Sequence, residues 1–116
     1  MPNTSDDLHR QMAELDQCIG SLRAVLLRYK KANIALMHLI EGGTPTLEAL
    51  ERVHASRHRP ELSDALDQLA GARHESRVAL LSLALQQGAS MADVGRAFSV
   101  SRQLASRLAA EIRKDS

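Results

Sequence analysis

The sequence predicts an all-α protein, in which a long N-terminal heptad helix and a helical bundle precede two short C-terminal helices joined by a tight turn. Three observations predict this class. Tyr29 and Phe98 are the only aromatic residues, so the core must consist of aliphatic residues, most of which favour helices over strands. No proline interrupts residues 4–41. Apolar residues recur at helical spacing along most of the chain.

Composition sets limits on the function. The chain has fifteen Lys and Arg and fourteen Asp and Glu, which gives a net charge of +1. A surface that binds nucleic acid would therefore have to be a local concentration of basic residues. Cys18 is the only cysteine, which excludes an intramolecular disulfide and favours a reduced compartment. The start MPNTSDD does not resemble a signal peptide, and no apolar run approaches the roughly 20 residues that span a bilayer. We therefore expect a soluble, cytoplasmic protein.

Residues 4–41 predict the first helix. Thr4 or Ser5 can cap its start, where two aspartates suit the positive end of the helix dipole, and Gly42-Gly43 ends it. At about 1.5 Å per residue this helix is on the order of 55 Å long. Such a length in so small a protein predicts a second chain beside it.

Apolar side chains along this helix are spaced four and three residues apart, as in a coiled coil. The dimerisation contacts that we expect are Leu8, Met12, Leu15, Ile19, Leu22, Leu26 and Tyr29. Asn33 continues the seam, and either fixes its register or marks where the helices begin to diverge. Cys18 lies beside the seam, as a small filler or as a redox switch.

A short second helix is expected after the glycines, with Thr44 as its cap and Pro45 at its first position. The segment that follows is rich in His and Arg, which indicates a solvated basic linker or a phosphate contact. His54 and His58 have the i, i+4 spacing of a chelating pair, but no Cys or carboxylate completes a site. We therefore expect no metal and no other cofactor.

Pro60 is expected to open the third helix, which extends to about Gln87. Gly71 and the polar run after it weaken the middle of this helix, so it bends there or two structural roles meet there. The first half would pack on the N-terminal helices, and the second half would join the C-terminal module.

Two short helices are predicted at the C-terminus. Ser90 and Asp93 form a capping-box pattern before the helix 91–98, and Ser101 can cap the helix 102–114 after the turn Ser99-Val100-Ser101. On the last helix one face is apolar, with Leu104, Ala105, Leu108 and Ile112. The other face carries Arg102, Gln103, Ser106, Arg107, Ala110, Arg113 and Lys114, with no acidic residue before Glu111.

That polar face has the chemistry of a base-reading helix. Arginine can bond guanine in a bidentate manner, glutamine can bond adenine, and small residues allow close approach to the base edges. The DNA contacts that we expect are Ser101, Arg102, Gln103, Ser106, Arg107, Arg113 and Lys114. A tight turn before this helix would leave it projecting from the bundle, as insertion into a major groove requires.

The run SMADVGRAFSVSRQLASRL resembles the helix-turn-helix of bacterial DNA-binding proteins, over about a third of the chain when residues 75–87 are included. Val94 matches the inward hydrophobic position, Gly95 the small residue between the two helices, and Phe98 the usual leucine. Val100-Ser101-Arg102-Gln103 matches the start of the recognition helix. The resemblance implies a three-helix, homeodomain-like unit. Ser99 departs from the family, because glycine is usual at a turn position that often needs positive φ.

These features predict a sequence-specific DNA-binding protein, a transcriptional regulator that binds double-stranded DNA as a homodimer. Its expected location is the cytoplasm, in association with the nucleoid. Residues 1–60 would form the dimerisation region, and residues 61–116 the linking helix and DNA-binding unit. The alternative is a helical adaptor that binds a protein, such as part of the transcription machinery, through the heptad helix. An enzyme is not expected, because the sequence lacks a Gly-rich phosphate loop, a nucleophile motif and a metal constellation. The helices leave little room for a small-molecule effector.

Overall fold

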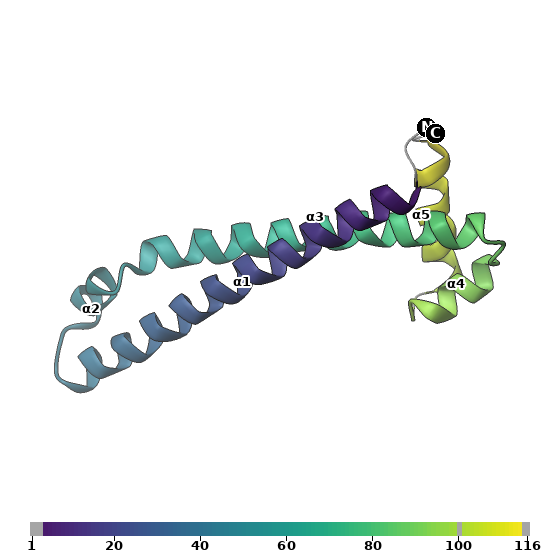
Figure 1. The fold of residues 1–116 in the computed structure, drawn as a ribbon. Coiled ribbons are helices and arrows are strands. Elements are labelled where there is room, and N and C mark those ends of the chain that lie inside the picture. Colours follow the sequence, from purple (N-terminus) through teal and green to yellow (C-terminus); the bar gives the residue numbers. More distant parts are fainter. Residues whose placement is uncertain (1–3, 100, 115–116) are drawn as a thin grey trace. The chain divides into compact units, whose positions relative to one another are not determined.

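The computed structural model describes residues 4–99 and 101–114, and in these residues it contains helices and no strands. The helices are α1 (Thr4–Glu41), α2 (Thr46–Arg52), α3 (Ala55–Gln86), α4 (Met91–Ala97) and α5 (Arg102–Lys114), which Figure 1 shows in chain order from purple to yellow. The predicted all-α fold is confirmed. No helix in the described part of the chain has both the length and the apolar character needed to cross a membrane.

α1 has the predicted bounds, and its C-terminal end is closed by backbone hydrogen bonds. The N–H of Thr44 donates to the carbonyl of Leu39 at 2.9 Å, and the N–H of Gly42 donates to that of His38 at 3.0 Å. Between them Gly43 has φ of 95°, a left-handed conformation that glycine adopts without a steric penalty. The paired glycines therefore end α1 as predicted.

The start of α2 differs by one position from the prediction. Pro45, not Thr44, is the N-cap residue, and it makes no side-chain capping bond. The carbonyl of Pro45 accepts the first helical hydrogen bond, from the N–H of Ala49 at 2.9 Å, so Thr44 lies in the turn before the helix. Ala49 is fully buried at the centre of α2.

α3 begins five residues before the predicted start, so the expected basic linker is mostly helical and Pro60 lies inside the helix. His54 forms the corner with φ of 57°, and its carbonyl accepts a hydrogen bond from the N–H of Arg57 at 2.9 Å. The ring Nε2 of His58 lies 3.0 Å from the carbonyl oxygen of Val53, which ties the first turn of α3 to the end of α2. These local bonds start the helix before the proline, which removes the hydrogen bond that residue 60 would otherwise donate to the carbonyl of Ser56.

The chain divides into two compact units. The first contains residues up to Leu15 together with Ala72 onward, and the second contains Asp16–Gly71. The predicted domain boundary between residues 60 and 61 falls inside α3, which is also unbroken at Gly71. Gly71 is nevertheless the last residue of the second unit.

The second unit is a helical hairpin, in which residues 16–41 of α1 run antiparallel to residues 55–71 of α3. An ion pair between Arg28 and Glu61, at 3.7 Å, joins the two helices. Ala49 and Ala65 are its only described residues that are buried. The hairpin thus has a very small core of its own.

The heptad seam of α1 divides into two stripes. Leu8, Leu15 and Leu22 are half-buried within the chain. Met12, Ile19 and Leu26 alternate with them and are 38%, 49% and 47% exposed, and Tyr29 is 37% exposed. Gln11, Cys18 and Val25 are half-buried instead, so the buried line of α1 does not include the whole predicted seam. Asn33 is exposed, and Cys18 is a free thiol.

Candidate nucleic-acid interface

The end of α3, α4 and α5 share one apolar core in the first unit. Its buried members are Leu81, Val94, Ala105, Leu108 and Ala109, and Phe98, Leu104 and Ile112 pack against them. Leu81 is the largest fully buried side chain among the described residues. α5 is therefore fixed to the unit along one face. Gly95 is buried on α4, as the resemblance implied for its small residue.

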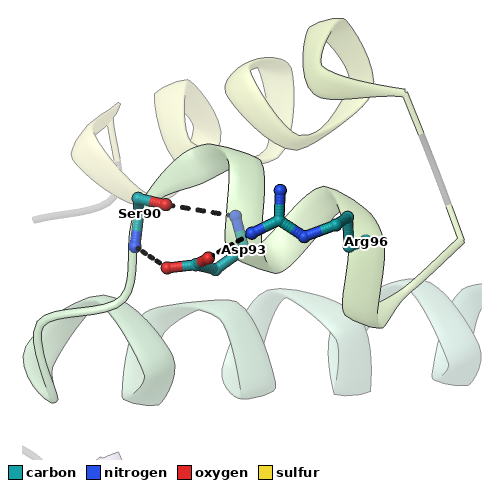
Figure 2. Close-up of polar contacts among 3 residues, drawn as sticks. All are labelled: Ser90, Asp93 and Arg96. Carbon is teal, nitrogen blue, oxygen red and sulfur yellow. Dashed lines mark hydrogen bonds and ion pairs between the residues drawn. The ribbon is translucent and has the colours of Figure 1, made fainter.

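α4 starts with the predicted capping box (Figure 2). The N–H of Asp93 donates to Oγ of Ser90 at 3.1 Å, and the N–H of Ser90 donates to the Asp93 carboxylate at 3.2 Å. Arg96, one turn later, forms an ion pair with the same carboxylate. Hydrogen bonds to the side chain and backbone of Ser90, reinforced by the positive charge of Arg96, lower the pKa of Asp93.

The turn between α4 and α5 has the backbone geometry that the resemblance implies. Ser99 has φ of 54°, the positive value expected where the family has glycine. Ser101 then caps α5 as predicted, because its Oγ accepts a hydrogen bond from the N–H of Leu104 at 3.1 Å. Its carbonyl accepts another from Ala105 at 3.1 Å. Val100 lies outside the described residues.

The outward face of α5 is a continuous exposed stripe, which we call the α5 stripe. It consists of Gln103, Ser106, Arg107 and Ala110, all exposed at helical spacing i, i+3, i+4 and i+7. Ala105, Leu108 and Ala109 form the opposite, buried face. Two of these four residues, Ser106 and Ala110, have small side chains, so the helix backbone can approach a binding partner closely. The side chains of Arg102, Arg113 and Lys114 lie outside the described residues.

The charges around the α5 stripe leave Arg107 available. Among the described residues no carboxylate lies within ion-pair distance of Arg107. The nearby Glu111 carboxylate lies 2.9 Å from Nε2 of His74 on α3. Arg96, by contrast, is already paired with Asp93. The guanidinium of Arg107 thus forms no ion pair among the described residues, although Glu111 follows four residues later on the same helix.

Three features of this unit were not predicted from the sequence. Ala109 is buried beside Leu108. Ser76 is buried and donates a hydrogen bond from its hydroxyl to the carbonyl of Arg73 at 2.9 Å. Its spacing of four residues from Ala72 and three from Ala79, which are also buried, could have indicated this burial from the sequence. The His74–Glu111 contact joins residues 37 positions apart, and local sequence carries no signal for it.

Metal ligation has no support in the described residues, where no group of three or more His, Cys, Asp or Glu is placed to hold an ion. The candidate pair His54 and His58 is separated by the corner at His54, and the ring of His58 is directed to a backbone carbonyl.

No protein-family model, no curated protein and no solved structure matches the chain. The α5 stripe is therefore the feature of the chain from which a function can be inferred.

Proposed function

We propose that the protein binds double-stranded DNA in a sequence-specific manner, with α5 in the major groove, and acts as a transcriptional regulator. The observation that carries this proposal is the α5 stripe. It joins an amide, a hydroxyl and an unpaired guanidinium on a helix whose opposite face is buried. These groups have no packing role in the described chain, and they are the groups that read base edges and phosphates.

The dimensions of the helix agree with this role. From Gln103 to Ala110 the stripe extends about 10 Å along the helix, at about 1.5 Å per residue. A major groove about 12 Å wide accepts a helix of this kind. Ser106 and Ala110 would lie nearest the bases because their small side chains permit close approach. Ser101 is a helix cap, so any contact that it makes to DNA would be in addition to that role.

A single unit of this size would contact few base pairs. Helix-turn-helix proteins commonly bind as dimers that read two half-sites about one helical turn apart, and linking two modules raises the effective affinity. We therefore propose that the protein acts as a homodimer on a two-part site, at the nucleoid of a bacterial cytoplasm.

The test is selection of bound sequences from a random DNA pool, using the full chain. The proposal predicts enrichment of a motif with two half-sites. A Gln103→Ala variant should relax the preference at one base position in each half-site and cost roughly 1–3 kcal/mol per contact. Arg28→Ala is the matched control, because it changes an exposed side chain of the other unit. Failure of the wild type to retain DNA at low salt would refute the proposal.

A second candidate function is a protein-binding adaptor, and a groove on the second unit favours it. The groove has a volume of about 560 Å³. Its lining residues, three apolar and three basic, are Lys31, Ile34, Ala35, His38, Leu39 and Arg52. Salt-dependent retention of DNA distinguishes the two functions, because an adaptor of this kind would not bind DNA.

A further inference from the structure

The hairpin of the second unit has two faces of different chemistry. Arg28 and Glu61 pair across one of them. In an antiparallel helix pair, both helices place the same heptad position on the same side of the contact between them. The residues that flank this contact on one side therefore form one face of the hairpin, and those on the other side form the opposite face. Ile19 and Leu26 on α1, and Leu66 on α3, have the heptad positions of the opposite face. They are 49%, 47% and 48% exposed.

We call these three residues the apolar face of the hairpin. The polar face consists of Ser21, Arg28, Glu61 and Gln68, which are all exposed. Scattered apolar residues on a surface need no explanation. Here, however, Ile19, Leu26 and Leu66 share one face, with Asn33 and Arg59 one heptad further on at the same heptad position. The equivalent positions of the other face carry Ser21, Arg28, Glu61 and Gln68.

The hairpin has few buried side chains. Among its described residues the buried ones are two alanines, Ala49 and Ala65. Helices in proteins gain most of their stability from packing of an apolar face. Burial of Ile19, Leu26 and Leu66 against a partner would therefore stabilise this unit.

We propose that a second copy of this chain covers the apolar face, with the two α1 helices antiparallel, to form a four-helix bundle. The charges beside this face identify the occupant. Asp16, Arg23 and Lys30 are exposed one heptad apart along α1, on the flank of Ile19 and Leu26. An antiparallel copy brings Asp16 of each chain opposite Lys30 of the other, with the two Arg23 residues at the centre. A parallel copy would place like charges opposite each other at all three positions.

This inference rests on the homodimer of the proposed function and identifies its contact surface. That surface keeps Ile19 and Leu26 of the seam expected from the sequence and adds Leu66 of α3.

The test compares two variants that add the same charge to opposite faces of the full chain. Leu26→Glu with Leu66→Glu changes the apolar face, and Ser21→Glu with Gln68→Glu changes the polar face. Sedimentation equilibrium at micromolar concentration should show dimers for the wild type and the polar-face variant, and monomers for the apolar-face variant. A monomeric wild type, or equal behaviour of the two variants, would overturn the proposal.

A charge exchange at exposed positions tests the orientation without placing charge in an apolar contact. Asp16→Arg should weaken dimerisation, and addition of Arg23→Glu and Lys30→Glu should restore it. If the triple variant dimerises no better than the single one, the antiparallel arrangement is wrong. DNA retention is measured on the same samples. A monomeric wild type that binds DNA refutes the homodimer and this interface but not DNA binding, and a dimer that binds no DNA refutes DNA binding but not this interface.

Discussion

Removal of the Arg107 guanidinium is expected to flatten the salt dependence of DNA binding. Arg107 is exposed on the α5 stripe, and no carboxylate of the described residues neutralises it. Each lost phosphate contact lowers the slope of log K against log salt by about 0.9. A dimer with one Arg107 contact per half-site would lose about 1.8, and a monomer about 0.9. Between roughly 50 and 200 mM salt, the affinity advantage of the wild type over Arg107→Ala should shrink about tenfold for a dimer and about threefold for a monomer.

The assay is a salt titration of binding by fluorescence anisotropy, on the selected site and on random DNA. The loss should be about equal on both, because a phosphate contact carries no sequence information. Arg28→Ala controls for the loss of one positive charge elsewhere in the chain, and circular dichroism verifies that each variant keeps its helices. An unchanged slope would remove Arg107 from the interface. A loss confined to the selected site would make it a base-reading residue.

Three further predictions concern the first unit. Ser99→Gly should raise the free energy of unfolding by about 0.5–1 kcal/mol in urea titrations, because Ser99 has positive φ; a decrease would show that the turn gains more from the serine than it loses in strain. Gln11→Leu should raise it by about 1–2 kcal/mol, since Gln11 Oε1 is buried without a hydrogen-bond partner; destabilisation would refute this. The lowered pKa of Asp93 means that its capping contribution is present above the unfolded pKa and is lost as the pH falls through the folded value. The difference in melting temperature between wild type and Asp93→Asn should therefore decline below about pH 4, and a constant difference would contradict this assignment.

The elements predicted best are those with local signals at both ends. The bounds of α1 and α5 agree with the structure, because paired glycines end the first helix and a capping serine starts the last. The capping box at Ser90 and Asp93 is confirmed for the same reason, since both partners lie within one turn. The positive φ at Ser99 agrees with the turn position at which the family has glycine.

The start of α3 could not be predicted from propensity, because proline is favoured at a helix start and Pro60 was taken as that start. The true start depends on His54 in a positive-φ corner and on the contact of the His58 ring with the Val53 carbonyl. Both are properties of the folded corner and not of the residue types. The division of the α1 seam has a similar cause, because a heptad stripe does not reveal whether its own chain or another covers each position.

The two faces of α5 are constrained in different ways, and this difference is the strongest reason to look for a ligand there. Ala105, Leu108 and Ala109 are enclosed by Leu81 and Val94, so packing restricts their size and polarity. Gln103 and Arg107 are exposed and have no hydrogen bond or ion pair among the described residues. Folding therefore leaves their identity free, and a helix that needed only solubility could carry any mixture of charges on that stripe. An amide and a cation beside small residues, without an acid on the stripe, instead match the surface of a duplex groove.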